Sequence, residues 1–295
     1  MLKKLYQELS DFQERMHRRS KAKFREYLKC KATECNLSYQ INPQSFASKN
    51  VIIGDFQNAE YILGAHYDTP PWMPSFLMKS VLLFNIILII IFLGLIVASI
   101  FGFNKFIAIF IYLIVMLYLL GFFSIANKYN YNDNTSGVMT LLYLMTIVKN
   151  QKVAYVFFDN EEKGLVGSLQ LAMVMKKMRN QSKKKFIIFD CVGRGNLFRL
   201  SSSRQGFAQE LKRNFSQDDN NEISYEVKKS SYLEGSDHLA FQSYDHVGIM
   251  CFQKKGKKYV LNNIHSHKDR EINLSNIEVL SSSVKRYLDK EEFSG

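Results

Sequence analysis

Several features that mark common classes of protein are missing from this sequence. Its four cysteines, Cys30, Cys35, Cys191 and Cys251, lack a tight metal-binding spacing, so we expect them to be reduced and mostly buried. No glycine-rich nucleotide-binding loop is present, which argues against an ATP-driven protease or transporter. The first 23 residues are charged throughout and have no apolar core, so we expect no secretory signal.

The sequence has a large excess of positive charge. With 39 Lys+Arg against 27 Asp+Glu, its formal net charge is +12. Such an excess favours either nucleic acid or an anionic membrane surface as a partner. The basic residues are scattered, and their clusters at 21–25, 183–185 and 254–258 are not interleaved with aromatic residues as in a single-strand binding groove. We therefore expect a lipid bilayer and no nucleic acid.

Two long uncharged runs occupy 81–101 and 106–125. Each has about 20 residues, enough at about 1.5 Å per residue to cross a hydrocarbon core of roughly 30 Å. Soluble helices of this length normally carry a polar face, which these runs lack. The sequence therefore predicts a transmembrane helical hairpin over 75–127, inserted between a first part of the main domain (1–74) and its remainder (128–295).

Outside the hairpin, short apolar runs alternate with amphipathic segments. Strand-like runs lie at 36–41, 50–53, 60–66, 153–158, 185–190, 196–200, 223–227 and 247–252. Helical spacing is found at 2–16, 138–148, 164–177 and 204–214, and a possible capping box, Ser275 to Glu278, starts a last helix. This alternation predicts an α/β domain with a mostly parallel mixed sheet flanked by helices.

The rest of the chain is organised around 153–168, VAYVFFDNEEKGLVGS. An apolar strand-like run ends there in Asp159, Asn160, Glu161 and Glu162. Adjacent glutamates cannot easily point the same way, so one can bind a metal while the other moves a proton. The alternative is a solvated helix start, where the helix dipole favours acidic residues.

Other metal-binding residue types also follow predicted strands. His66 and Asp190 end two of them, Asp133 begins a loop into a helix, and His265 lies in a late loop. Carboxylates and imidazoles gathered at strand ends suit a metal such as zinc. Two metals about 3.5–4 Å apart need a bridging carboxylate, and Asp133 is suited to that role. Taken singly, each residue also allows a structural role in the core, in a helix cap or on the surface.

The order of these motifs resembles a known family. They are His66-Tyr67-Asp68, Asp133-Asn134 with Ser136-Gly137, Glu161-Glu162 with Gly164-Leu165 and Gly167-Ser168, Asp190, Ser236-Asp237-His238, and Ile264-His265 with Asp269. Together they resemble the family-28 metallopeptidases of clan MH, the co-catalytic zinc aminopeptidases. The resemblance covers nearly all of the chain outside the hairpin. The sequence departs from the family between His66 and Asp133, where relatives have a short soluble loop.

The resemblance implies roles for individual residues. One zinc would be held by His66, Asp133 and Asp190, and a second by Asp133, Glu162 and His265. Glu161 would be the general base, and Asp68 would orient His66, as carboxylates commonly do for ligating histidines. His265 is preferred to His267 because its spacing to Asp269 matches the family. Asp237 and His238 match a motif near the substrate site, and Tyr232 is either a group that polarises the scissile carbonyl or a packed surface residue.

The implied activity is zinc-dependent hydrolysis of peptide bonds, with two zinc ions and aminopeptidase action on peptide substrates. A glutaminyl cyclase, which resembles the same family but uses a single zinc, is the alternative enzyme, and metal stoichiometry separates the two. A catalytically silent membrane receptor or scaffold is the alternative outside enzymes. The sequence leaves the oligomeric state open.

The charges that flank the hairpin predict its orientation. Lys79 and Lys128 lie on the domain side, and only Lys105 lies in the opposite loop. The positive-inside rule then puts the catalytic domain and both termini in the cytoplasm of a cell-membrane protein with two spans. Because the hairpin is inserted between His66 and Asp133, the active site would open near the inner membrane surface.

Overall fold

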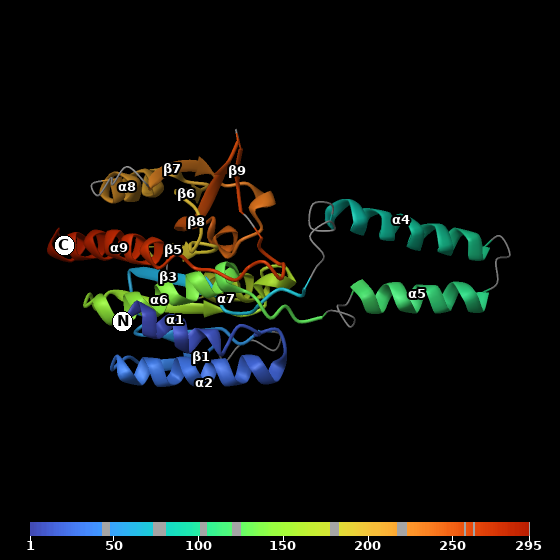
Figure 1. Ribbon diagram of the computed structural model, residues 1–295, viewed down its shortest axis with the longest axis horizontal. Coiled ribbons are helices and arrows are strands. Elements are labelled where there is room, and N and C mark those ends of the chain that lie inside the picture. Colours follow the sequence, from blue (N-terminus) through green and yellow to red (C-terminus); the bar gives the residue numbers. More distant parts are fainter. Residues whose placement is uncertain are drawn as a thin grey trace.

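A mixed β-sheet runs through the molecule and carries helices on both faces (Figure 1). The computed structural model describes residues 1–42, 48–72, 81–100, 105–119, 125–177, 183–216, 223–256, 258–261 and 263–294. The strands are β1 (Tyr39–Ile41), β2 (Val51–Ile53), β3 (Tyr61–His66), β4 (Val153–Phe158), β5 (Lys185–Phe189), β6 (Leu197–Ser202), β7 (Ser224–Lys229), β8 (Asp245–Lys255) and β9 (Lys258–Val260).

The described strands form one sheet in the order β1-β2-β4-β3-β5-β8-β6-β7, with β9 paired to β8. The central strands β4, β3, β5 and β8 are parallel, as are β6 and β7. The remaining pairings, β1 with β2, β2 with β4, β6 with β8 and β8 with β9, are antiparallel. The predicted α/β class with a mixed sheet is confirmed, and parallel pairing dominates at its centre rather than throughout.

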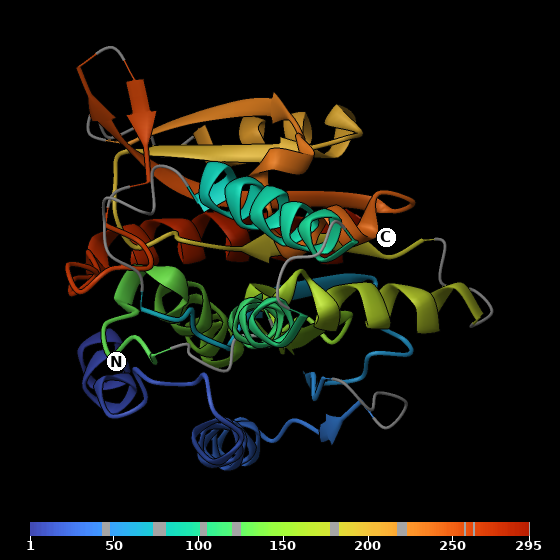
Figure 2. The ribbon, with the colours of Figure 1, turned by 90° about the vertical axis from the view of Figure 1, so that its right-hand side faces the viewer.

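The described helices lie on both sides of the sheet, except the two within 81–119, which project away from it (Figures 1 and 2). They are α1 (Leu2–Ser10), α2 (Arg18–Glu34), α4 (Val81–Ile100), α5 (Lys105–Leu119), α6 (Ser136–Ile147), α7 (Val166–Lys177), α8 (Gln205–Phe215) and α9 (Leu274–Ser294). Short helical turns are η1 (Tyr131–Thr135), η2 (Glu161–Lys163), η4 (Tyr232–Glu234) and η5 (Asp237–Phe241).

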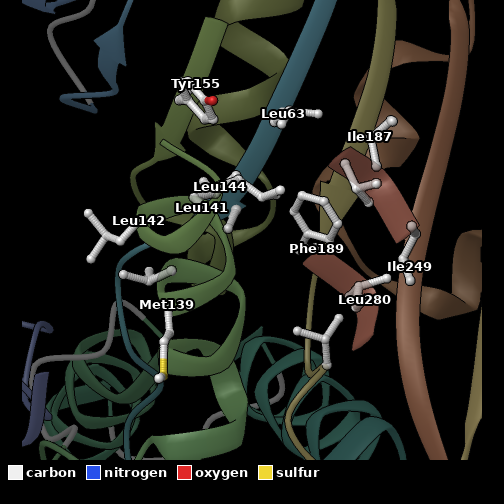
Figure 3. Close-up of a cluster of buried hydrophobic side chains, with 14 of the residues drawn as sticks. Leu63, Met139, Leu141, Leu142, Leu144, Tyr155, Ile187, Phe189, Ile249 and Leu280 are labelled. Atoms are coloured by element: carbon white, nitrogen blue, oxygen red, sulfur yellow. The ribbon is translucent and has the colours of Figure 1, made fainter. Parts of the chain in front are cut away.

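The central strands are mostly apolar where they are buried, because both of their faces are covered there. Successive side chains of a strand point to opposite faces. Leu63, Tyr155 and Ile187 therefore pack with residues of α6 and α9 in one core cluster (Figure 3). Their neighbours Ile62 and Val156 pack on the other face with residues of α7 and η5.

The register of the central strands brings their carboxyl ends together. His66, the last residue of β3, pairs with Phe158, the last residue of β4. On the other side of β3, Gly64 pairs with Ile188 of β5. Two residues further along that register, His66 lies beside Asp190. The polar residues that follow these strands therefore meet at one edge of the sheet.

Two predicted helix boundaries are wrong for the same reason. The predicted helix 2–16 ends at Ser10, because the segment after it bonds to distant loops: Gln13 Oε1 accepts from the N–H of Asn130 at 3.1 Å. The last helix begins at Leu274, and Asn273 rather than Ser275 caps it, since its Oδ1 accepts from the Ser275 N–H at 3.1 Å. In both places side-chain hydrogen bonds replace the expected pattern.

Helices α4 and α5 form a hairpin that points away from the rest of the molecule (Figure 1). The Phe92 and Tyr112 rings pack with centroids 4.8 Å apart between the two helices. At the base of the hairpin Pro71 pairs with Ala126, and the Trp72 N–H donates to the Ile125 carbonyl at 2.6 Å. The insertion is thus closed at its base by backbone pairing.

The hairpin differs from the prediction of two membrane spans at 81–101 and 106–125. Helix α5 has 15 residues, and residues 101 and 120–124 of the predicted spans lie outside the described residues. Among the residues that the structure describes, no helix combines the length and apolarity that crossing a membrane requires. Lys79, used above for the orientation, lies outside the described residues.

Gly64 lies at a point of close packing in β3. A Cβ there would lie 2.6 Å from Phe158 Cε2 and 2.7 Å from Ile188 Cδ1. We expect Gly64→Ala to lower the free energy of unfolding by about 1–3 kcal/mol, as overpacking does in cores. Gly206→Ala is the matched control, because a Cβ at that position of α8 meets nothing within 4 Å. Urea denaturation checks both, and equal effects of the two substitutions would contradict the packing argument.

Candidate metal centre

His66 lies between two carboxylates at the carboxyl edge of the sheet. Its Nε2 is 3.4 Å from Asp133 Oδ1 and 3.6 Å from Asp190 Oδ1. Its Nδ1 is 3.1 Å from the backbone oxygen of Asp68, which can only accept, so Nδ1 carries the proton. Nε2 is then the nitrogen that faces the two carboxylates and that would bind a metal once deprotonated. His66, Asp133 and Asp190 form one group with the spacing of metal ligands.

A second group shares Asp133. His265 Nε2 lies 2.9 Å from Asp133 Oδ2 and 3.7 Å from Glu162 Oε2. Asp133, Glu162 and His265 therefore form another set of metal-type ligands, with the ligand atoms within 4.8 Å of one another. The two oxygens of Asp133 face different histidines, which is the arrangement that a bridging carboxylate needs.

The donor atoms fit zinc. Imidazole nitrogens and carboxylate oxygens are its usual ligands in catalytic sites. Glu162 Oε1 is buried and finds no hydrogen-bond partner among the described residues, as expected for an oxygen reserved for an ion. The Asp133 carboxylate is almost completely buried, as is the neighbouring His66 imidazole. A carboxylate buried in this way needs a cation nearby.

Asp68 connects the two strand ends that carry His66 and the glutamate pair. Its Oδ1 accepts a hydrogen bond from the Glu161 N–H at 3.0 Å, and its Oδ2 accepts from the Glu162 N–H at 3.3 Å. Its Oδ1 also lies 3.6 Å from His66 Nδ1. Asp68 therefore fixes the imidazole and the backbone of both glutamates, and belongs to the support of the site.

Asp269 and Asn134 hold the turn that presents Asp133. Asp269 accepts from the N–H groups of Asn132 at 2.8 Å and Asp133 at 3.0 Å. Asn134 donates to the Phe189 carbonyl at 3.0 Å and accepts from the Cys191 N–H at 3.1 Å, which links this turn to the end of β5. Sequence reasoning used Asp269 only for its spacing and gave Asn134 no role, because the partners of both are distant in the chain.

The electrostatics of the cluster follow from its burial. Burial opposes the charged form of His265, but Glu162 and Asp133 outweigh it and raise the pKa of His265 to about 10. Burial raises the pKa of Glu162 to about 8, and the charge of Asp133 adds to this effect. Burial likewise raises the pKa of Asp269 to about 7.

Glu161 is placed to handle protons. It groups with His66 and Glu162 and is itself 8% exposed. Burial raises its pKa well above the usual range, His66 opposes this, and the charges of Glu162 and Asp237 add to it. A buried carboxyl with a raised pKa beside a metal-type cluster has the properties of a general base or acid.

The three predicted substrate-site residues lie outside the described metal-type groups. Asp237 is buried near Glu161, and burial raises its pKa to about 7. His238 is held by Glu234 and Ser230, each 3.3 Å from its Nε2. Tyr232 is 81% exposed. The structure therefore brings Asp237 towards the metal cluster, holds His238 against Glu234 and Ser230, and leaves Tyr232 on the surface.

Zinc binding at neutral pH should release protons, because His265 and Glu162 have raised pKa values and zinc needs their deprotonated forms. The affinity should rise with pH between about pH 6 and pH 9. Calorimetric titrations in buffers of different ionisation enthalpy measure the release. His265→Ala should reduce it, and His267→Ala, at an exposed histidine, should not. A binding heat that is the same in every buffer would contradict this assignment.

Solved structures with the same fold span nearly the whole chain. Porphyromonas gingivalis glutaminyl cyclase matches with a TM-score of 0.67 and 16% identity, covering 98% of this chain and 97% of that chain. A leucine aminopeptidase precursor from Bacteroides thetaiotaomicron has a TM-score of 0.64 and 15% identity, covering 97% and 96%. A Zn-dependent exopeptidase from Parabacteroides distasonis has a TM-score of 0.65 and 12% identity, covering 95% and 94%.

At these identities the likeness establishes the fold alone. No curated protein matches the sequence with significance. The model of one family does match, over residues 122–283, which include Asp133, Asp190 and His265. This match covers more than half of the chain, and the chain accordingly belongs to peptidase family M28.

Proposed function

We propose that this protein is a zinc-dependent aminopeptidase with two zinc ions per chain. The observation that carries the proposal is Asp133, whose two carboxylate oxygens face His66 and His265 from opposite sides of one buried cluster. His66 and Asp190 would hold one ion with Asp133, and Glu162 and His265 would hold the other. When bound, such a pair of ions lowers the pKa of a shared water and polarises the substrate carbonyl.

Glu161 would take the proton from the attacking water and deliver it to the leaving amine. Bound cations would lower its raised pKa, because a nearby positive charge favours the carboxylate. Asp68 keeps Glu161 in place through the backbone N–H at 3.0 Å, so the base would be pre-positioned. The acidic surroundings, with Asp237 close to Glu161, favour a substrate that brings a free α-amine. This charge pattern supports exopeptidase action.

The test of the base is Glu161→Gln. We expect zinc binding to persist and the hydrolysis of aminoacyl-nitroanilides to fall by roughly 10²–10⁴-fold, because the proton acceptor is removed. Glu60→Gln is the matched control, since Glu60 lies at the opposite end of β3 with a half-exposed side chain and should leave the rate unchanged. Added chelator should abolish activity in the parent. Absence of chelator-sensitive hydrolysis across varied aminoacyl substrates and short peptides would overturn the proposal and favour a silent scaffold.

Glutaminyl cyclase activity is the competing reaction, since glutaminyl cyclases are among the solved structures that share this fold. A peptide with an N-terminal glutamine separates the two. An aminopeptidase releases free glutamine, and a cyclase releases ammonia and leaves a pyroglutamyl peptide. Mass spectrometry of the products decides between them, and a pyroglutamyl product with no free glutamine would replace our proposal.

We further propose that the uncharged runs 81–101 and 106–125, which α4 and α5 cover in part, anchor the protein in a lipid bilayer as two spans, with the catalytic domain and both termini on the cytoplasmic side. Large apolar side chains are exposed along both helices, among them Ile90, Val97, Phe106 and Phe110. Covering each would stabilise the protein by about 1.5–3 kcal/mol, so a surface of this kind calls for an apolar partner. The uncharged runs and the excess of basic residues favour an anionic bilayer over a second copy of the chain.

The hairpin leaves the domain at Trp72 and returns at Ile125, close in the chain to His66 and Asp133. The site would therefore open towards the bilayer surface, and peptides held or released there are the substrates we propose. In this arrangement the hairpin brings the catalytic edge of the sheet to the membrane.

Replacing 75–127 with a short soluble linker tests the anchor. The parent should float with vesicles that contain anionic lipid, and the variant should stay in solution because its apolar surface is gone. Equal flotation of the two, or a parent that only forms dimers, would contradict the proposal. For the topology, Ser294→Cys in a Cys30→Ser background should resist an impermeant reagent added outside cells, and strong labelling would place the domain on the other side.

A further inference from the structure

The segment 12–25, which includes the end of the connection between α1 and α2 and the start of α2, contacts three of the five segments that carry metal-type ligands. Arg15 is the centre of these contacts and is fully buried. Its backbone N–H donates to Thr69 Oγ1 at 2.9 Å, and its Nε donates to the Tyr67 carbonyl. Its Nη2 donates to Thr135 Oγ1 at 3.0 Å. One side chain thus ties the loop after His66 to the turn that contains Asp133.

Lys21 reaches the third of these segments. Its Nζ donates to Asp159 Oδ1 and to Asn160 Oδ1, both at 2.6 Å, and its side chain is 7% exposed. Asp159 and Asn160 immediately precede Glu161 and Glu162 in the chain. Lys21 therefore holds the turn from which the general base and one metal ligand project.

The charges of these two residues suit their positions. The cluster gathers six carboxylates. Five of them are buried, namely Asp68, Asp133, Glu161, Asp190 and Asp237, and Glu162 is partly buried. Arg15 lies near enough to Asp68 and Asp133 for their charges to support its protonated form against burial, and its pKa of about 10 keeps it cationic at neutral pH. Lys21 adds a second positive charge, and its Nζ pairs with Asp159 Oδ1 at 2.6 Å. Both cations belong to the same short segment.

We propose that Arg15 and Lys21 are positioning residues that hold these three ligand segments in their metal-binding arrangement. The inference rests on the metal site of the proposed function and is independent of which amide reaction that site performs. Neither residue reaches the reacting atoms, and both act through the backbone and side chains that present the ligands. A ligand set held before the ion arrives loses less entropy on binding. Removing a buried supporting contact commonly costs about 10–100-fold in metal affinity.

The experiment uses Co²⁺ as the probe, because its visible absorption reports ligand geometry and its titration reports affinity. Arg15→Met and Lys21→Met should each weaken Co²⁺ binding about tenfold or more and change the spectrum of the bound ion. Lys184→Met is the matched control. Lys184 is also a buried cation, bonded to the carbonyls of Phe56 at 2.7 Å and Gln57 at 3.1 Å, but it lies at the opposite end of β5 from Asp190. The control should lose stability and keep the affinity and spectrum of the parent.

Milder variants separate positioning from folding. Thr135→Val removes the acceptor of Arg15 Nη2, together with a long hydrogen bond of 3.5 Å to Gln13 Oε1, and should weaken Co²⁺ binding even if Arg15→Met does not fold. Lys21→Arg keeps a charged donor and should restore most of the affinity lost in Lys21→Met. Folded variants that bind Co²⁺ with parental affinity and spectrum would overturn the proposal, as would an equal loss in Lys184→Met. A parent that binds Co²⁺ but hydrolyses no peptide would overturn the proposed function alone, and a parent that binds no Co²⁺ would overturn both.

Discussion

The central constraint in this structure is the burial of several carboxylates in one place. The parallel register of β3, β4 and β5 aligns their carboxyl ends, so the polar residues that follow each strand meet. Like charges brought together away from water repel one another strongly unless cations or protons compensate them. Burial and the neighbouring charges accordingly raise the pKa values of Glu162 and His265. Metal ions would relieve the same constraint in the working enzyme.

The support around the ligands consists of hydrogen bonds between loops that are far apart in the sequence. Asp68 accepts from the backbone of both glutamates, and Asp269 accepts from the backbone of the Asp133 turn. Arg15 and Lys21 add positive charge to the same loops. The side chains at the centre can thus keep bonding capacity for metal and substrate, because their positions are set by neighbours.

Much of this could be predicted from the sequence, because some signals are local. The apolar run before Asp159 predicts a buried strand, and a polar residue at such a strand end predicts a site; His66 and Asp190 follow this rule. The order of motifs indicated the family, which the match over 122–283 confirms. The supporting residues had no such signal. Arg15 lies 52 residues from Tyr67 and 120 from Thr135, and Lys21 lies 138 from Asp159, so only the folded chain brings these partners together.

The most direct measurement is a crystal structure of the zinc-loaded protein with diffraction data collected at the zinc absorption edge. Our account predicts two anomalous peaks about 3.5–4 Å apart, one on each side of the Asp133 carboxylate. His66 and Asp190 should contact one peak, and Glu162 and His265 the other. A single peak would contradict the two-zinc site, and zinc bound away from this cluster, or no peak at all, would contradict the account as a whole.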